Sequence, residues 1–409
     1  MALRRRTAAV VLAVLLVLAL LFTLADADLQ SQKEASKPEV FVGVDVAYGG
    51  ESAVYAVADA VYGYANLIIV GSLNVTENTA ALTRVCNFLY EKGFYFIVYV
   101  GFALYDYLPP RGPDPTFFSM ASAQWGDKFL GGYFFDEVGG SQLDTQEKVV
   151  SSVPNSQFTA RDYTFASEAY VAGLIGDLSI SLDWFNPSPV QSELFTSDYG
   201  LYWYDYLSGY GTVFTEFVGN QSRQIAVALD RGAAHALGEN WGVIITYQPS
   251  GLPGAPPGPE IGVENATQLY SDMTFAWQSG AKYIVVFDGN STDASSSGVL
   301  TQEHIDAMKQ FWNYTKTNTR NGEYPADIAY VLPVDYGYGF RSPSDTIWGL
   351  WNADALSTKV WNDANSLFVT YGNNLDIVYE NRIDSQPIAL PYKTLIFWNG
   401  TTIQSSSTP

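Results

Sequence analysis

The chain has 409 residues, of which 47% are hydrophobic and 15% aromatic, so it can bury a large core. Its net charge is −21 and its isoelectric point is about 4.3. Because binding to nucleic acid requires basic patches that contact phosphates, this charge argues against nucleic acid as a partner. An acidic surface mainly indicates solubility.

The chain begins with the features of an export signal. Arg4–Arg6 precede an apolar run from Ala8 to Ala25. A basic segment before an apolar stretch is typical of a signal peptide, and this run is also close to the roughly 20 residues that span a bilayer. Residues 1–27 are therefore predicted to be a signal peptide or a membrane anchor, and residues 28–38 a linker. The folded part is expected to be extracellular or at the cell surface, either secreted or membrane-anchored.

The cysteine and asparagine positions add to this prediction. Cys86 is the single cysteine, which excludes an internal disulfide and a cysteine-based metal site. Asn-x-Ser/Thr triplets are glycosylation acceptors, and six of them in an exported chain predict a surface glycoprotein. The acceptors are Asn74, Asn220, Asn265, Asn290, Asn313 and Asn399.

From residue 39 to residue 320, strand-like and helix-like segments alternate. Short apolar runs rich in β-branched and aromatic residues predict eight strands. They are Val40–Val46, Asn66–Gly71, Tyr95–Gly101, Leu130–Asp136, Tyr199–Tyr206, Thr212–Val218, Trp241–Tyr247 and Tyr283–Asp288. The helices are expected at Ser52–Ala65, Ala80–Lys92, Thr159–Trp184, Gln221–Leu237, Ala266–Ser279 and Gln302–Thr315. This alternation predicts an α/β fold, a (β/α)8 TIM barrel that forms the catalytic domain, with a doubly wound open sheet as the alternative.

A second, smaller unit is predicted over residues 321–400. Its expected elements are the strands Asp327–Leu332, Leu375–Tyr379 and Thr394–Trp398 and the helix Ser357–Tyr371. This order indicates a small β-α-β, Rossmann-like unit that packs on the barrel. The Ser/Thr-rich residues 401–409 are predicted to be a disordered tail.

Barrel enzymes carry their site at the C-terminal ends of the strands, so the polar residues expected there are candidates for function. Acids predominate among them, whereas His235 and His304 fall in predicted outer helices. This argues against a Ser-His-Asp triad and a histidine-based zinc site, and neither a metal nor another cofactor is expected. The candidate catalytic residues are Glu137, Asp136, Glu216 and Asp288. The candidate substrate-binding residues are Asp45, Tyr48, Tyr105, Trp203, Asp205, Tyr247 and Gln248.

Carboxylates among Tyr and Trp rings suit glycoside hydrolysis, which needs one carboxyl as proton donor and a second as base or nucleophile. Glu137 is the predicted donor, because nearby aromatic rings favour a raised pKa. Glu216 or Asp288 would be the second carboxylate, and Asp136 would position the donor or stabilise the transition state.

Each candidate also has an ordinary structural interpretation. Asp136 and Glu137 could cap a helix or pair with Arg161, and Glu216 could be a surface acid. Asp288 could cap a turn, and Asp45 could anchor a loop. The aromatic stretch Tyr199–Tyr210 could stack on sugars or simply pack in the core, and core packing is the favoured interpretation.

The segment 131–137, Gly-Gly-Tyr-Phe-Phe-Asp-Glu, resembles the strand-four signature of the spherulin-type barrel glycosidases, which act on galactosaminogalactan. It also resembles the Asn-Glu end of strand four in clan A glycoside hydrolases, where the Glu is the acid/base. The spherulin-type resemblance implies that Asp136 and Glu137 form the acidic pair of the site and that Glu216 is its later acid. The clan A pattern places a nucleophilic Glu at the end of strand seven, where this chain has Tyr247-Gln248 instead.

The C-terminal unit resembles the glutamine-amidotransferase-like domain that follows the barrel in some β-galactosidases. The strands of that domain would correspond to Asp327–Pro333, Leu375–Tyr379 and Tyr392–Trp398. This copy is short and has no amidotransferase nucleophile, so the resemblance implies a structural role.

The sequence therefore predicts an extracytoplasmic glycosidase with a polysaccharide or glycan as its partner. Two alternatives stay open at this point. One is a non-catalytic glycan-binding or envelope protein on a barrel scaffold, and the other is a carbohydrate transferase or esterase that uses the same pocket.

Overall fold

A computed structural model describes most of the chain after residue 37. The described ranges are 38–101, 110–144, 160–185, 193–219, 221–246, 265–288, 300–320, 322–380, 382–383, 386–387 and 390–404. The predicted signal or anchor and nearly all of the linker lie outside these ranges. Within them, no helix has the length and apolarity to cross a bilayer. Residues Val40–Pro409 form one compact unit.

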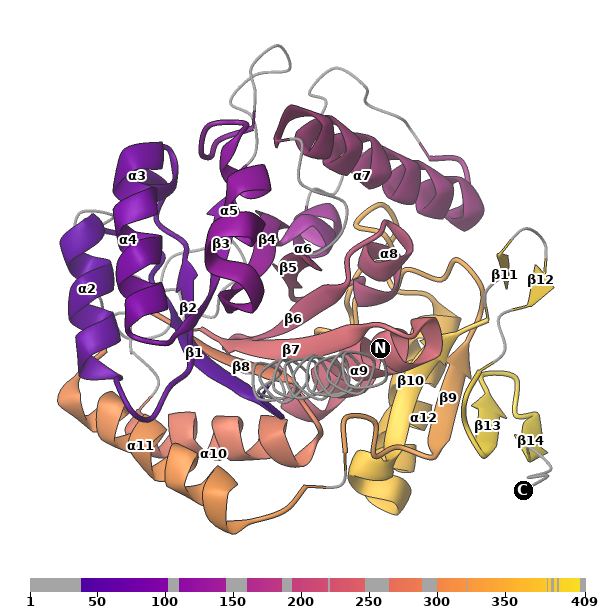
Figure 1. Cartoon of the computed structure of the whole chain (residues 1–409). Helices are drawn as coiled ribbons and strands as arrows, with labels where there is room; N and C mark the ends of the chain where they lie inside the picture. The colour runs from indigo at the N-terminus through magenta and orange to yellow at the C-terminus, as the bar shows by residue number, and fades with distance from the viewer. Residues whose placement is uncertain are drawn as a thin grey trace, which may run out of the picture. The chain divides into compact units, whose positions relative to one another are not determined.

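Eight parallel strands close into a barrel in chain order (Figure 1). The strands are β1 (Phe41–Asp45), β2 (Leu67–Val70), β3 (Tyr95–Val100), β4 (Phe129–Asp136), β5 (Glu193–Asp198), β6 (Thr212–Phe217), β7 (Asn240–Ile245) and β8 (Tyr283–Phe287). Strand β8 pairs with β1 and thereby completes the ring. The prediction of a TIM barrel is confirmed, and the alternative of an open sheet is wrong.

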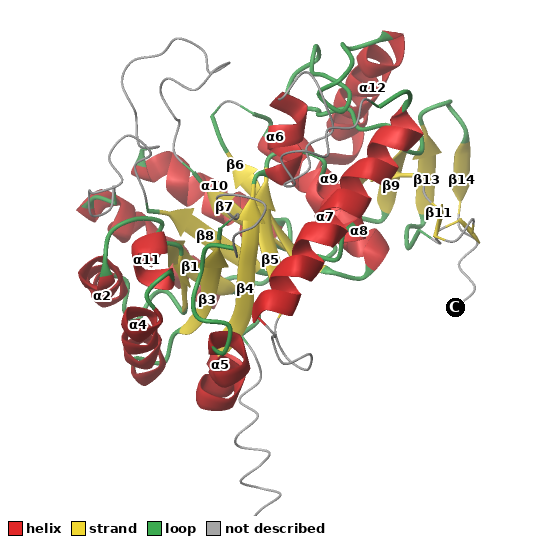
Figure 2. Cartoon of the chain, turned by 90° about the horizontal axis from the view of Figure 1, so that it is seen from above, coloured by secondary structure: helices red, strands yellow, loops and turns green. Residues whose placement is uncertain are grey.

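Helices surround the strands (Figure 2). They are α2 (Glu51–Ala60), α3 (Leu73–Thr76), α4 (Thr79–Glu91), α5 (Phe117–Trp125), α6 (Val138–Asp144), α7 (Tyr163–Phe185), α8 (Tyr202–Leu207), α9 (Arg223–Leu237), α10 (Ala266–Gln278) and α11 (Gln302–Thr317), with a 3₁₀ turn, η1 (Gly126–Lys128), before β4. Local sequence explains where several of them begin. Asn78, Ser222 and Asn265 cap α4, α9 and α10, because each side chain accepts a hydrogen bond from a first-turn N–H group.

Aromatic rings fill much of the barrel interior. Phe41 stacks on Tyr283 with ring centroids 4.9 Å apart, and Phe195 stacks on Phe214 at 5.8 Å. Gly242 leaves room for these rings, since a Cβ atom there would lie 2.7 Å from the Cβ of Tyr283. The interior is therefore a packed core, and a substrate can meet the barrel only at its rim.

The fifth strand differs from the prediction. Strand β5 spans Glu193–Asp198, whereas most of the predicted strand Tyr199–Tyr206 lies in helix α8, which follows the left-handed residue Leu201 (φ 57°). The aromatic residues of α8 have high strand propensity, but their rings pack on the C-terminal unit. The ring centroids of Tyr204 and Trp348, for example, lie 4.5 Å apart. Tertiary packing overrides propensity here.

The C-terminal unit contains a four-stranded sheet in the order β10-β9-β13-β14. Its strands are β9 (Ile328–Leu332), β10 (Leu375–Tyr379), β13 (Thr394–Phe397) and β14 (Thr402–Gln404), and its helices are α12 (Ala355–Tyr371) and the 3₁₀ turn η2 (Gly372–Asn374). Two short strands, β11 (Arg382–Ile383) and β12 (Gln386–Pro387), pair separately. Strand β14 pairs antiparallel with β13, so the predicted disordered tail is wrong for residues 402–404.

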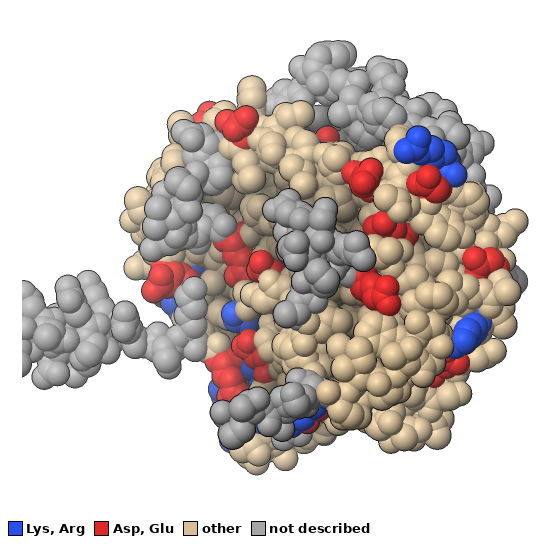
Figure 3. Space-filling view, turned by 90° about the vertical axis from the view of Figure 1, so that its right-hand side faces the viewer, with Lys and Arg blue, Asp and Glu red and all other residues tan. Residues whose placement is uncertain are grey.

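On one face of the molecule, acidic side chains are scattered among uncharged ones (Figure 3).

A buried ion pair joins the barrel to the C-terminal unit. Arg231 of α9 donates from Nε to Asp376 Oδ1 of β10 at 2.7 Å, and the two side chains are 1% and 0% exposed. The same guanidinium donates to the backbone carbonyls of Ser279, Asn373 and Leu375. Next to it, Gly232 allows close approach, because a Cβ atom there would lie 2.5 Å from the carbonyl oxygen of Ile377.

This ion pair generates a prediction about stability. Arg231→Ala leaves the Asp376 carboxylate buried without its cation, so we expect the free energy of unfolding to fall by about 3–5 kcal/mol in chemical denaturation. The double variant Arg231→Ala/Asp376→Asn should recover part of this loss. Arg111→Ala, which removes a solvent-exposed pair with Glu77, is the control and should change stability far less. Equal losses of unfolding free energy in Arg231→Ala and Arg111→Ala would contradict a stabilising role for the buried Arg231–Asp376 pair.

Candidate active site

The carboxyl ends of the strands bring five predicted acids to one end of the barrel. Asp45 ends β1, Asp136 and Glu137 end and follow β4, Glu216 lies near the end of β6, and Asp288 follows β8. They are close enough to influence each other's ionisation. Burial and then the charges of Asp136 and Asp288 raise the pKa of Asp45. Burial and then the charge of Glu137 raise the pKa of Glu216.

Glu137 and Glu216 are in direct contact. Their side chains form a carboxyl–carboxyl hydrogen bond. Burial and the neighbouring charge of Asp136 raise the pKa of Glu137 to about 7. Since two carboxylates cannot both be acceptors in one hydrogen bond, the pair holds a proton near neutral pH.

Two hydroxyl groups support the charged members of the cluster. Tyr99 of β3 donates from its hydroxyl to Asp136 Oδ1 at 2.7 Å. Ser197 of β5 donates to Glu216 Oε1 at 2.6 Å and accepts from the hydroxyl of Tyr133, also at 2.6 Å. Sequence reasoning missed Ser197 because it placed the fifth strand too late. It missed the role of Tyr99 because the partner of Tyr99 is 37 residues away.

The backbone at the end of β4 is strained. Phe135 and Glu137 both have φ 56°, in the left-handed region that non-glycine residues rarely adopt. The β4–β5 register shifts between Tyr133 and Asp136. Such conformations cost about 1–3 kcal/mol each and persist where surrounding contacts impose them. Here they allow Asp136 and Glu137, adjacent in sequence, both to join the cluster, although adjacent residues of a regular strand point to opposite faces.

Neighbouring residues hold this strained segment at successive positions. The hydroxyl of Tyr210 donates to the carbonyl of Phe134 at 2.8 Å, and the hydroxyl of Thr196 donates to the carbonyl of Phe135. The N–H group of Glu137 donates to the carbonyl of Ser197 at 2.9 Å. Residues that follow Phe195 in the chain thus fix the end of β4.

Asp45, Tyr48 and Asp288 line the β1–β8 side of the cluster. Asp45 is 4% exposed, and its Oδ1 atom has no hydrogen-bond partner within the described part of the chain. The half-buried Tyr48 packs edge-on against Phe287, and burial and the charge of Asp136 raise the pKa of Tyr48. Asp288 Oδ1 accepts a hydrogen bond from the N–H group of Leu300 at 3.1 Å, so Asp288 also holds a loop, as its structural interpretation predicts.

Two predicted substrate-binding residues lie elsewhere. Trp203 and Asp205 belong to α8 and are 2% and 1% exposed. Trp203 packs against Tyr379 of the C-terminal unit, and Asp205 accepts a hydrogen bond from Tyr170 at 2.7 Å. A substrate cannot reach either side chain in this arrangement, because both are enclosed by protein. Core packing is the correct interpretation of this stretch.

Other predictions have different outcomes. Arg161 lies 3.5 Å from Asp162, and no ion pair between it and Asp136 or Glu137 is found among the described residues. Tyr105, Tyr247 and Gln248 lie outside the described residues, as do the acceptors Asn220 and Asn290. The other four acceptors, Asn74, Asn265, Asn313 and Asn399, are exposed, and their glycosylation stays a prediction.

Comparison with solved structures identifies the fold class. The β-galactosidase from Rahnella sp. R3 has a TM-score of 0.53 and 11% identity over 88% of this chain and 67% of that one. The β-galactosidase from Halorubrum lacusprofundi has a TM-score of 0.53 and 12% identity over 88% and 69%. The GH5_18 protein from Streptomyces cattleya, solved with Manβ1-4GlcNAc, has a TM-score of 0.48 and 13% identity over 88% and 99%. No family model and no curated protein matches the sequence.

The two β-galactosidases, at a TM-score of 0.53, share the overall fold of this chain, whose strands form a TIM barrel. At such low sequence identity, the similarity supports a shared fold and no shared activity or substrate. The finer resemblances, to the spherulin-type family and to an amidotransferase-like domain, stay predictions.

The raised pKa of Glu137 predicts how stability depends on pH. The folded state binds this proton more tightly than the unfolded chain, because the pKa is about 7 instead of 4.5. Its stabilisation is therefore complete below about pH 4.5 and is lost as the pH rises through 7. Between pH 5 and 8, the free energy of unfolding should fall by up to about 3 kcal/mol more in the wild type than in Glu137→Gln.

Chemical denaturation at a series of pH values measures this difference. Glu303→Gln, at an exposed position in the first turn of α11, is the matched control and should keep the slope of the wild type. An unchanged slope in Glu137→Gln would show that Glu137 does not hold the proton.

Proposed function

We propose that the protein is a glycoside hydrolase that cleaves a polysaccharide or glycan at the C-terminal end of the barrel. One observation carries this proposal: the half-buried Glu137 and the buried Glu216 share a hydrogen bond, and Glu137 has a pKa of about 7. Hydrolysis of a glycosidic bond needs one protonated and one ionised carboxyl group, and a pair with one proton supplies both. The barrel fold shared with two β-galactosidases is compatible with this chemistry.

Glu137 is assigned as the proton donor and Glu216 as the nucleophile. Burial and the charge of Asp136 favour the protonated form of Glu137, and they outweigh its hydrogen bond with Glu216, which favours the ionised form. Burial and the charge of Glu137 raise the pKa of Glu216 as well, and the hydroxyl of Ser197, which donates to Glu216, is the contact that favours its carboxylate form. Asp136, bound to the hydroxyl of Tyr99, stays close to Glu137 and supports the developing positive charge on the sugar ring.

The closeness of the pair favours retention of configuration. Retaining enzymes hold their two carboxyl groups roughly 5–5.5 Å apart, and inverting enzymes roughly 6.5–9.5 Å apart to leave room for a water molecule. Carboxyl groups in hydrogen-bond contact leave no such room. In the first step Glu137 protonates the glycosidic oxygen, the bond from C1 to that oxygen breaks, and Glu216 forms an ester with C1. In the second step the Glu137 carboxylate takes a proton from water, and the water oxygen replaces Glu216 at C1.

Substitutions at the two glutamates test these roles. Glu137→Gln should lower kcat about 10²- to 10⁴-fold on substrates with poor leaving groups, and much less on aryl glycosides whose leaving group needs no proton. Glu216→Gln should abolish turnover on both, because the ester cannot form. Rates would be measured on a panel of aryl glycosides and oligosaccharides, with Glu303→Gln as a surface control. Wild-type rates in both glutamate variants would refute the assignment.

A glycan-binding protein without activity is the second candidate function. It is favoured by the burial of Glu216, which is 4% exposed, because a closed acid pair is poorly placed to attack a substrate. Glycan arrays and sugar-release assays on the same preparation separate the two. Saturable binding with no released sugar would favour this candidate.

We also propose that the protein works outside the cytoplasm, on the strength of the basic and apolar N-terminal segment. Expression of the full chain followed by fractionation and N-terminal sequencing tests this. A new N-terminus near residue 28 in the soluble fraction is expected for a cleaved signal, and an intact N-terminus in the membrane fraction for an anchor. Recovery of the intact chain in the soluble cytoplasm would contradict the proposal.

A further inference from the structure

Helix α6 begins immediately after Glu137, and Asp198 holds its first turn. Asp198, the last residue of β5, accepts hydrogen bonds from the N–H groups of Gly139 and Gly140 at 2.5 and 2.7 Å. It also accepts from the N–H groups of Tyr199 and Gly200 at 2.7 and 3.1 Å. Asp198 is only 1% exposed, so these four backbone groups take the place of water around its carboxylate.

The first turn of α6 fits this carboxylate closely. A Cβ atom at Gly139 would lie 2.5 Å from the carbonyl oxygen of Gly200 and 2.9 Å from Asp198 Oδ2. A Cβ atom at Gly140 would lie 2.1 Å from the ring of Tyr199. Only glycine lets both N–H groups approach the carboxylate, so the Gly139-Gly140 pair is part of the same contact.

The other end of α6 is held by the C-terminal unit, through residues 335–351, which we call the brace segment. Its Trp348 carbonyl accepts a hydrogen bond from Gln142 Nε2 at 2.7 Å, and the hydroxyl of Thr346 donates to the carbonyl of Leu143 at 3.1 Å. Arg341 donates to Asp144 Oδ1 at 2.7 Å. Helix α6 is thus fixed at its first turn by β5 and at its last turn by the brace segment.

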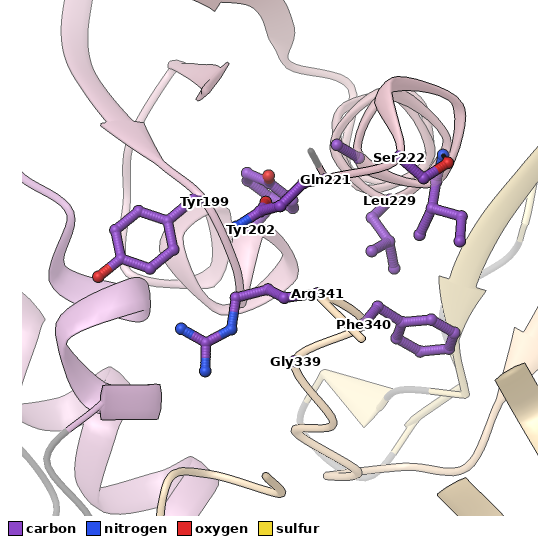
Figure 4. Close-up of a pocket in the computed structure, with 10 residues that line it drawn as sticks. Tyr199, Tyr202, Gln221, Ser222, Leu229, Gly339, Phe340 and Arg341 are labelled. Carbon is purple, nitrogen blue, oxygen red and sulfur yellow. Dashed lines mark hydrogen bonds between the residues drawn. The ribbon is translucent and has the colours of Figure 1, made fainter. Parts of the chain in front are cut away.

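Figure 4 shows how the brace segment reaches the loops at the barrel end. Phe340 and Arg341 line a small pocket together with Tyr199, Tyr202, Gln221 and Leu229. The guanidinium of Arg341 lies 5.7 Å from the centroid of the Tyr199 ring. Tyr199 in turn donates from its hydroxyl to Asp144 at 2.8 Å. The residue after Asp198 is therefore tied to the same end of α6 as the brace segment.

We propose that Asp198 is a positioning residue for Glu137, which directs the Glu137 carboxyl toward Glu216 by anchoring the first turn of α6. Glu137 has β5 contacts on both sides of its Cα atom. Its own N–H group donates to the carbonyl of Ser197, and the N–H groups two and three residues later donate to Asp198. These contacts hold Glu137 at φ 56°, a conformation that a free chain would leave. The expected effect on catalysis rests on the proposed function, whereas the expected effect on the position of the Glu137 carboxyl does not.

The competing explanation is that Asp198 only stabilises the fold. Both explanations expect Asp198→Asn to lower the melting temperature, because an amide nitrogen would face backbone N–H groups. Only a positioning role expects a selective loss of proton donation. A displacement of about 1 Å in a catalytic group can cost about 10²-fold in rate.

The test compares Asp198→Asn with Asp230→Asn in the full chain. Asp230 of α9 is an equally buried acid, 0% exposed, and it accepts a hydrogen bond from the hydroxyl of Tyr206 at 3.0 Å. Within the described part of the chain it makes no hydrogen bond to α6, so it reports the effect of losing a buried carboxylate alone. Kinetics would be measured on glycosides with poor and with activated leaving groups. In parallel, ¹³C NMR would follow the titration of the Glu137 carboxyl, identified by its absence in Glu137→Gln.

In Asp198→Asn, kcat on poor leaving groups should fall about 10²-fold with KM changed less than about threefold, and activated leaving groups should restore most of the rate. The pKa of Glu137 should move from about 7 toward its ordinary 4.5 as the carboxyl leaves its buried position. Asp230→Asn should keep both values near those of the wild type. An unchanged kcat and titration in Asp198→Asn, or equal losses in both variants, would overturn the inference.

Two further controls keep the result interpretable. If the wild type hydrolyses no glycoside, the proposed function fails, and the titration of Glu137 alone decides the positioning role. If Asp198→Asn does not fold, Gly139→Ala replaces it, because the added methyl group pushes α6 away from an intact Asp198 carboxylate. It should reproduce the same shift in titration, and an unshifted pKa in this variant would also overturn the inference.

Discussion

The carboxyl groups of Glu137 and Glu216 form a hydrogen bond among other acidic side chains. Burial and the negative charges of these neighbours raise the pKa of both glutamates. This contact follows from the closed barrel. Parallel strands that pair in a ring all end at the same rim, so acids far apart in the sequence have to meet there. Binding of protons relieves the charge repulsion, which is why raised pKa values recur around this rim.

Holding such a cluster together requires a rigid frame. Much of that frame comes from β5, where Thr196, Ser197 and Asp198 bind the end of β4 and the start of α6. Ser197 has a second task, since its hydroxyl also contacts Glu216. The brace segment adds support from the C-terminal unit, which Arg231 locks onto α9. The second unit is therefore part of the support of the site.

Sequence reasoning found the features that depend on local pattern. Seven of the eight strands had recognisable apolar runs, and their ends correctly located Asp45, Asp136 and Glu216. The fifth strand was missed because Glu193–Asp198 mixes polar and apolar residues and lies beside an aromatic stretch with high strand propensity. That error hid Ser197 and Asp198.

Other features could not be read from one sequence, because their causes lie in contacts between distant residues. The left-handed φ of Glu137 depends on Ser197, and the burial of Trp203 depends on Tyr379. Aromatic composition was compatible with both a sugar-binding surface and a core. Only the packing of α8 against the C-terminal unit decides for the core.

The proton shared by Glu137 and Glu216 has a consequence for the thermodynamics of ligand binding. A sugar that enters between the two carboxyl groups has to break their hydrogen bond, which changes the affinity of each for its proton. Binding is then coupled to exchange of protons with the buffer. The heat observed in calorimetry will include the ionisation enthalpy of that buffer, and the apparent affinity will vary with pH even for an uncharged sugar.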